Sequence, residues 1–132
     1  MQVQEQSFLI VDDEPDACWA LERILERQRG TRCRRAATAE AALGEVRRGS
    51  FALALLDAKL PDMDGLELAR HVRAIDGALP IIIVSGYFYQ DDVAIQAALK
   101  QGLIQCFVAK PFRHEEIVRA VAEAIQQRGG RK

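Results

Sequence analysis

Short runs of consecutive apolar residues recur along this chain, and longer amphipathic segments separate them. Because such runs lack alternating polar residues, they indicate strands that are buried on both faces of a sheet. Strands that alternate with helices form parallel sheets with both faces covered. The predicted strands are Ser7–Val11, Thr31–Ala36, Phe51–Leu56, Ile81–Val84 and Cys106–Ala109. The pattern therefore predicts a doubly wound α/β domain with a five-stranded parallel sheet.

The second strand departs from this apolar pattern and thereby helps to order the sheet. Arg32, Arg34 and Arg35 make it too polar for the centre, which predicts a position at the edge. With right-handed crossovers, this position favours the strand order 2-1-3-4-5 of a flavodoxin-like (βα)5 fold. The helices are predicted to run from Pro15 to a stop at Gly30, from Thr38 to a stop at Gly49, over Gly65–Ala74, over Asp91–Gln101 and over Arg113–Gln127.

Length, charge and cysteine content restrict the class of protein. The 132 residues suit a single domain, with a core over about 7–127 and a frayed tail at 128–132. A net charge of -1 argues against general binding to nucleic acid or membranes, and no apolar run reaches the roughly 18 residues of a spanning helix. The three cysteines are odd in number and lack CxxC spacing, which predicts reduced thiols and a cytoplasmic location.

Polar side chains stand directly after four of the predicted strands. Asp12 and Asp13 follow the first strand, Asp57 the third, Ser85 the fourth and Lys110 the fifth. The carboxyl ends of parallel strands meet at one edge of the sheet, where doubly wound proteins bind their ligands. We therefore expect three carboxylates, a hydroxyl group and an ammonium group in one crevice.

Three neighbouring carboxylates must either take up protons or bind a cation, because one pair of like charges about 4 Å apart costs about 4 kcal/mol at an effective dielectric constant of about 20. Mg²⁺ fits, since it takes oxygen ligands, retains waters and commonly binds few carboxylates together with a phosphate. When a metal and Lys110 neutralise the phosphoryl oxygens, a carboxylate can attack phosphorus and form an aspartyl phosphate. Asp57 is the predicted nucleophile because it stands alone at the end of a buried strand. Asp12 and Asp13 are the predicted metal ligands, and Ser85 is a predicted hydrogen-bond donor to the phosphoryl group.

Several motifs make this chain resemble the receiver domain of response regulators in two-component signal transduction. The resemblance runs from Phe8 to about Ile125. Its motifs are Val11-Asp12-Asp13-Glu14-Pro15, Leu55-Leu56-Asp57, Leu60-Pro61 with Met63-Asp64-Gly65, Ile81–Ser85-Gly86 and Phe107-Val108-Ala109-Lys110-Pro111-Phe112. The resemblance implies that Asp57 accepts a phosphoryl group from a histidine kinase or a histidine phosphotransfer protein.

The resemblance also implies a set of metal ligands around this aspartate. Mg²⁺ would be bound by Asp13, Asp57 and the backbone carbonyl of Ala58, and Asp12 would act through a water molecule. The cofactor expected from the residues alone and the cofactor implied by the family are therefore the same ion.

Further residues receive roles from the same resemblance. It implies that Lys110 and Ser85 bind the phosphoryl group and that the Lys110–Pro111 peptide bond is cis. It also implies a switch in which the ring of Phe107 turns inward when Ser85 moves toward the phosphate. Phe107 lacks the hydroxyl group that is common at this position of the family, so packing is expected to separate its two orientations.

Two positions that vary within the family carry unusual residues here. Lys59 lies two residues after the predicted phosphoacceptor, and Tyr87 lies two residues after Ser85. We expect Lys59 and Tyr87 to shield the aspartyl phosphate and to lengthen its lifetime. The segment 102–107 has one residue more than the commonest spacing in the family.

The expected function is a phosphorylation-activated signalling switch. Such a domain is not an enzyme with a separate substrate, although it catalyses its own phosphoryl transfer and slow dephosphorylation. The signal is expected to leave through the surface of Asp91–Gln101, Cys106–Ala109 and Arg113–Gln127. The expected recipient is a downstream protein or a covalently linked output domain absent from this chain, and a homodimer stays open. Neither nucleic acid nor a membrane is an expected partner of this domain.

Two other classes of protein are compatible with parts of the pattern. One is an interaction module that keeps the fold but works without phosphorylation; the filled site positions argue against it. The other is a phosphatase of the haloacid dehalogenase type, which uses a DxD pair at the end of the first strand. Here Asp57-Ala58-Lys59 lacks the second acid and follows the third strand.

Overall fold

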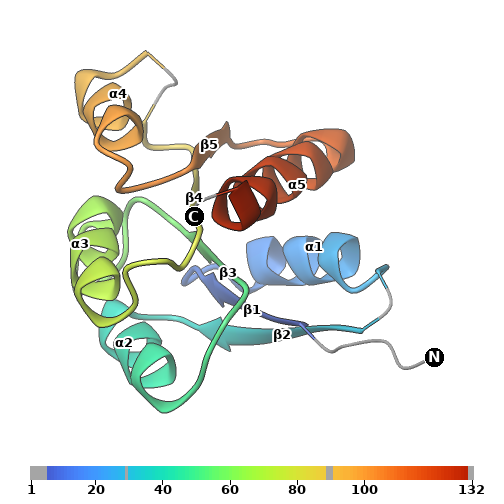
Figure 1. The fold of residues 1–132 in the computed structure, drawn as a ribbon. Helices are drawn as coiled ribbons and strands as arrows, with labels where there is room; N and C mark the ends of the chain where they lie inside the picture. Colours follow the sequence, from blue (N-terminus) through green and yellow to red (C-terminus); the bar gives the residue numbers. More distant parts are fainter. Residues whose placement is uncertain (1–5, 29, 89–90, 131–132) are drawn as a thin grey trace.

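The computed structural model describes residues 6–28, 30–88 and 91–130, which form a parallel sheet between two layers of helices (Figure 1). The strands are β1 (Gln6–Val11), β2 (Thr31–Ala36), β3 (Leu53–Leu56), β4 (Ile81–Ser85) and β5 (Cys106–Ala109). They lie in the order β2-β1-β3-β4-β5, and every neighbouring pair is parallel. The predicted fold class and strand order are confirmed.

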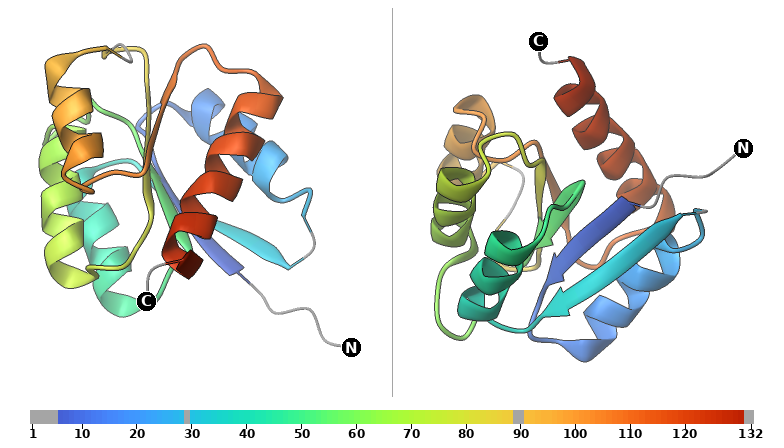
Figure 2. Two further views of the ribbon diagram at one scale, coloured as in Figure 1. Left: turned by 45° about the horizontal axis from the view of Figure 1, so that its top comes forward. Right: turned by 60° about the horizontal axis from the view of Figure 1, so that its bottom comes forward.

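The helices divide between the two faces of the sheet. They are α1 (Pro15–Leu25), α2 (Ala39–Arg48), α3 (Gly65–Ile75), α4 (Val93–Lys100) and α5 (His114–Gly130). Helices α1 and α5 cover one face, and α2, α3 and α4 cover the other, as Figure 2 shows. Across the described ranges, none of these helices combines the length and apolarity needed to cross a bilayer.

Each central strand supplies side chains to both layers. In β1, Phe8 and Ile10 belong to the buried cluster under α1 and α5, whereas Leu9 and Val11 belong to the cluster under α2, α3 and α4. Successive side chains of a strand point to opposite faces, so a strand buried on both sides must be apolar throughout. The continuous apolar runs of the sequence have this physical cause.

The arginines of the edge strand β2 bind acids on the helices beside it. Arg34 lies 3.1 Å from Glu45 of α2, and Arg35 lies 2.7 Å from Glu22 of α1. These exposed ion pairs place charge along the outer strand, which discourages pairing with a strand of another molecule. The predicted edge position of Thr31–Ala36 is confirmed.

Helices α1 and α5 end three or more residues from their predicted ends, whereas the ends of α3 and α4 differ from the prediction by one residue. Helix α1 ends at Leu25 instead of continuing to Gly30, because the chain already turns toward β2: the Gln28 N–H donates to the Leu25 carbonyl. Gly30 has a φ of 80°, so it serves the turn before β2 in a left-handed conformation. Helix α5 continues to Gly130, so 128–130 are helical where a frayed tail was predicted. Glycine costs a helix only about 1 kcal/mol, which permits this extension; 131–132 lie outside the described residues.

Arg73 of α3 joins the loops that precede β4 and β5. Its guanidinium donates to the carbonyls of Gly77 and Leu79 ahead of β4. It also donates to the carbonyl of Leu103 ahead of β5, at 2.7 Å, and to Oε1 of Gln105. One side chain thus supplies donors to two loops that are distant in sequence.

Replacing Arg73 with methionine keeps the aliphatic stem and removes these charged donors. We expect the free energy of unfolding to fall by about 2–3 kcal/mol, because hydrogen bonds from charged groups to part-buried carbonyls are lost. Urea denaturation measures the change. Arg70→Met, at an exposed position of the same helix, is the matched control and should change stability by less than about 0.5 kcal/mol. Equal losses in the two variants would contradict this account of Arg73.

Candidate functional site

The carboxyl ends of the central strands lie side by side at one edge of the sheet. The Asp57 N–H, directly after β3, donates to the carbonyl of Val11 at the end of β1, at 2.8 Å. The Lys110 N–H, directly after β5, donates to the carbonyl of Ser85 at the end of β4, at 3.0 Å. The sheet register therefore places the residue after each strand beside the end of its neighbour, which brings the predicted site residues together.

Three carboxylates gather at this edge. Oxygens of Asp12, Asp13 and Asp57 lie within 4.8 Å of one another. Asp12 and Asp57 are buried, at 4% and 8% exposure, while Asp13 is exposed. The predicted convergence of these three acids is confirmed. Carboxylate oxygens are the donors that hard divalent cations prefer, and the exposed side leaves room for water ligands, so this set of donors fits Mg²⁺.

The ammonium group of Lys110 lies among the acids. Its Nζ is 2.7 Å from Asp12, 3.1 Å from Glu14 and 3.8 Å from Asp57. Burial lowers the pKa of Lys110, but the hydrogen bond to Asp12 and the charges of Asp12 and Asp57 outweigh it and raise the pKa overall. The lysine therefore stays charged and offsets part of the repulsion among the carboxylates.

The environment of Asp57 favours its protonated form more than water would. Burial raises the pKa of the Asp57 carboxyl above its ordinary value of 3.8, and the charge of Asp12 raises it further. Lys110, the backbone N–H of Lys59 and the Ser85 side chain act in the opposite direction. Because ionised Asp57 is less favoured here than it would be in water, a cation or an electrophilic phosphorus that takes up its charge relieves part of that cost.

The loop after Asp57 is held by contacts within itself and with the start of α3. Lys59 and Asp64 pair as an antiparallel bridge. The Gly65 N–H donates to the carbonyl of Ala58 at 2.7 Å. This hydrogen bond directs the Ala58 carbonyl at the first turn of α3, so the expected backbone ligand of the metal is already engaged within the loop. A carbonyl oxygen has two lone pairs, so the role of Ala58 as a metal ligand stays a prediction.

Sequence reasoning missed two residues that organise this edge of the sheet, Glu14 and Asp62. The Asp62 carboxylate accepts hydrogen bonds from the N–H groups of Ala39 and Glu40, at 2.8 Å and 3.0 Å, and so caps α2 from the phosphoacceptor loop. Local sequence gave no signal for it, because Thr38 already stands at the N-cap position and accepts from the next turn. The available signal for Glu14 was its place directly after the acidic pair.

The predicted lifetime residues meet beside the hydroxyl group of Ser85. Nζ of Lys59 lies 5.1 Å from the centre of the Tyr87 ring, a distance typical of a cation–π contact. The Tyr87 N–H donates to Oγ of Ser85 at 2.9 Å. The Lys59 side chain therefore contacts the Tyr87 ring, and the Tyr87 backbone contacts Ser85; that the pair shields a phosphoryl group stays a prediction.

The predicted switch residue Phe107 is buried, at 9% exposure, within the cluster under α2, α3 and α4. Its ring thus occupies an inward position in this structure. The Lys110–Pro111 peptide bond is cis, as the resemblance implies.

The comparisons with known proteins agree with this fold. The family model of the response regulator receiver domain matches residues 8–122. The response regulator protein TmoT of Ectopseudomonas mendocina is 32% identical over 127 residues, which cover 96% of this chain and 56% of that protein. The transcriptional regulatory protein ZraR of Klebsiella oxytoca is 30% identical over 125 residues, covering 95% of this chain and 27% of ZraR. The chain thus spans only about half, or less, of the length of these relatives.

Solved structures show the same class of domain. A CheY-like response regulator receiver domain protein from Methanospirillum hungatei superimposes with a TM-score of 0.85 at 27% identity, covering 96% of this chain and 98% of that one. A response regulator protein from Burkholderia pseudomallei, with a phosphorylated aspartic acid and a calcium ion, has a TM-score of 0.78 at 25% identity and covers 93% of this chain and 70% of that one. The chain belongs to the response regulator receiver domain family. This membership supports a phosphoaspartate signalling switch as its general function.

Proposed function

We propose that this domain accepts a phosphoryl group on Asp57 from a phosphohistidine of a kinase or phosphotransfer protein, with Mg²⁺ as cofactor. The observation that carries the proposal is the placement of a buried carboxylate beside two further acids and a lysine, at the ends of neighbouring strands. An aspartate that merely ended a strand would not be expected to lie beside both acidic side chains and a lysine. The phosphorylated aspartate of the Burkholderia pseudomallei relative supports the same chemistry.

The proposed step exchanges one bond to phosphorus for another. An oxygen of ionised Asp57 forms a bond to phosphorus, while the bond between phosphorus and the donor's histidine nitrogen breaks. The imidazole keeps the electron pair of that bond and takes up a proton. Lys110 offsets the negative charge of the transferred oxygens, and the Ser85 hydroxyl group donates a hydrogen bond to one of them.

Asp13 and Asp57 are the residues that would bind Mg²⁺ directly, with Asp12 holding a water ligand. When bound, the ion supplies positive charge beside the phosphoryl oxygens. The burial of Asp12 and its short contact with Lys110 suit a residue that acts through water, whereas exposed Asp13 is free to bind the ion. The calcium ion of the Burkholderia pseudomallei relative supports a divalent cation in such a site.

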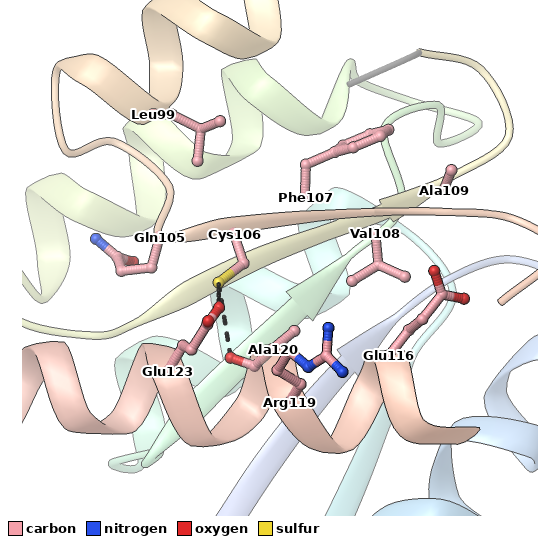
Figure 3. A pocket seen from close by; sticks show the side chains of 10 residues that line it. All are labelled: Leu99, Gln105, Cys106, Phe107, Val108, Ala109, Glu116, Arg119, Ala120 and Glu123. Atoms are coloured by element: carbon pink, nitrogen blue, oxygen red, sulfur yellow. Dashed lines mark hydrogen bonds between the residues drawn. The ribbon is translucent and has the colours of Figure 1, made fainter. Parts of the chain in front are cut away.

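The proposed output surface lies along β5, between α4 and α5. A groove of about 470 Å³ there is lined by Leu99 of α4, by β5 and by Glu116, Arg119 and Glu123 of α5 (Figure 3). Figure 3 shows Phe107 and Val108 on opposite sides of β5 within this groove. A change in the orientation of Phe107 would therefore alter the surface that a downstream protein or a linked output domain contacts.

The proposed acceptor can be identified chemically. Borohydride reduces an acyl phosphate to an alcohol, so a phosphorylated Asp57 would become homoserine, which peptide mass spectrometry locates. We expect homoserine at position 57 after incubation with acetyl phosphate and Mg²⁺. Homoserine at position 12 or 13 instead would reject Asp57 as the acceptor. No homoserine at any position, in a folded sample, would favour the module that works without phosphorylation.

Mg²⁺ affinity is expected to depend on pH through Asp57. The raised pKa means that the folded protein retains a proton on Asp57 above the ordinary value of 3.8, and the proton competes with the metal. The affinity should therefore fall on acidification while the pH is still above that value. The same shift makes stability fall as the pH rises toward the raised pKa, because there only the folded state binds the proton. Calorimetric titration with Mg²⁺ at several pH values measures the affinity. In Asp57→Asn the affinity should lose its pH dependence; a pH dependence that persists in this variant would contradict the assignment of the effect to Asp57.

The phosphoryl group is expected to last longer because Lys59 and Tyr87 cover it. Replacing both with alanine removes an exposed cation–π contact and opens the crevice to water, which should shorten the lifetime by about two- to fivefold. The decay of the phosphorylated mass measures it. Arg23→Ala with Trp19→Ala removes the corresponding contact on α1, also 5.1 Å long, and should leave the lifetime unchanged. Unchanged decay in the Lys59 and Tyr87 variant would disprove the shielding.

A further inference from the structure

Glu14 contacts Lys110 but is not one of the residues proposed to bind the phosphoryl group or the metal. Its carboxylate is 3.1 Å from Nζ of Lys110, although 96 positions separate the two residues. The Glu14 side chain is 66% exposed, whereas the Lys110 side chain is 17% exposed. The contact therefore joins a residue at the rim of the crevice to one inside it.

The backbone of Glu14 is held in place for this contact. Its N–H donates to Oδ1 of Asp12 at 2.9 Å, and Pro15 begins α1 directly after it. Glu14 occupies the N-cap position of α1, where an acceptor side chain commonly bonds the first turn. Here the side chain makes no such capping bond and reaches Lys110 instead.

These contacts turn the lysine toward the first strand. Nζ of Lys110 is within hydrogen-bond distance of Asp12 and Glu14, at 2.7 Å and 3.1 Å, but lies 3.8 Å from Asp57. An ammonium group has three N–H donors, and two of them are engaged by Asp12 and Glu14 instead of by the phosphoacceptor. A phosphoryl group on Asp57 needs the same ammonium group.

We propose that Glu14 is a positioning residue that competes with the incoming phosphoryl group for Lys110 and thereby slows phosphorylation. This inference rests on the proposed function, because it concerns the rate of that same transfer. Asp12 is needed at the metal site, but Glu14 can give up the lysine at little cost, since its carboxylate is already largely in water. The pair thus sets how readily the lysine turns toward Asp57.

The test compares Glu14→Gln with Asp16→Asn, which removes the same charge from an exposed position in the first turn of α1. We expect Glu14→Gln to gain the phosphoryl group from acetyl phosphate about two- to fivefold faster than wild type, the range that exposed ion pairs provide. Asp16→Asn should match wild type. Because salt screens exposed charges, the advantage of Glu14→Gln should shrink toward onefold at about 1 M salt, where the screening length is about 3 Å. A purely structural effect of the substitution would not vanish in this way.

A second readout needs neither phosphate nor metal. The side-chain ¹⁵N resonance of Lys110 reports its ion pairs, so it should shift in Glu14→Gln and stay in place in Asp16→Asn. An unshifted Lys110 resonance, or a rate in Glu14→Gln that equals or falls below wild type, would overturn the inference while leaving the proposed function intact. If wild type itself gains no phosphoryl group, the proposed function fails first, and this inference fails with it.

Discussion

Gly65→Ala is expected to lower the free energy of unfolding by about 3 kcal/mol or more, one of the largest effects of any single substitution in this domain. A Cβ atom at position 65 would lie 2.2 Å from the carbonyl oxygen of Asp57 and 2.7 Å from Cα of Ala58. Both are backbone atoms, so the loop and the start of α3 would have to move apart. Glycine is required here for the close approach of two backbone segments.

Gly44→Ala is the matched control for this substitution, because it lies within α2 and its Cβ would meet only the Arg48 side chain, at 3.5 Å. Alanine is the better helix former, so this variant should be more stable than wild type by about 0.5–1 kcal/mol. Urea denaturation compares the two. Since the clash in Gly65→Ala falls on the backbone of Asp57, any folded fraction should also accept a phosphoryl group more slowly. Stability within about 1 kcal/mol of wild type would show that the loop adapts, contrary to this account.

Lys110→Met is expected to change phosphoryl transfer and Mg²⁺ binding in opposite directions. Without the ammonium group nothing replaces its charge on the transferred oxygens, so the phosphorylation rate should fall by about 10²- to 10³-fold. Lys110 also competes with a metal for the carboxylates, since its Nζ lies 2.7 Å from Asp12 and 3.8 Å from Asp57. Removing it should therefore raise the affinity for Mg²⁺.

The two effects can be measured separately, the rate from intact mass over time and the affinity by calorimetry. Lys100→Met, at an exposed position near the end of α4, is the control and should alter neither quantity. A parallel fall in rate and affinity in Lys110→Met would mean that the lysine only supports the fold of the crevice. Opposite changes identify it as the cation that shares the acids with the metal.

Much of the fold could be predicted because its physical causes are local. A strand buried on both faces must be apolar along its whole length. The apolar runs at Phe51–Leu56 and Ile81–Val84 could therefore be recognised as containing buried strands. The arginines of Thr31–Ala36 placed that strand at the edge, and right-handed crossovers reduced the remaining orders. Helix ends were harder to predict. Gly30 belongs to a turn outside α1, and the position of that turn depends on where β2 must begin in order to pair with β1.

The site was predictable to the extent that it follows from strand ends. Asp12, Asp57 and Lys110 meet because parallel strands end at one edge, which topology alone dictates. Contacts that depend on side-chain reach or loop path were not predictable. The Asp62 cap of α2 spans 22 to 23 positions, and the Glu14 contact with Lys110 spans 96.

Asp57 is proposed to accept a phosphoryl group with the help of Mg²⁺. The most direct measurement is the intact mass of the protein after incubation with acetyl phosphate, with and without Mg²⁺, beside Asp57→Asn. We predict a gain of one phosphoryl group that requires Mg²⁺ and is absent in the variant. A gain that persists in Asp57→Asn, or no gain by a folded wild-type protein even from a phosphorylated histidine kinase, would contradict the claim.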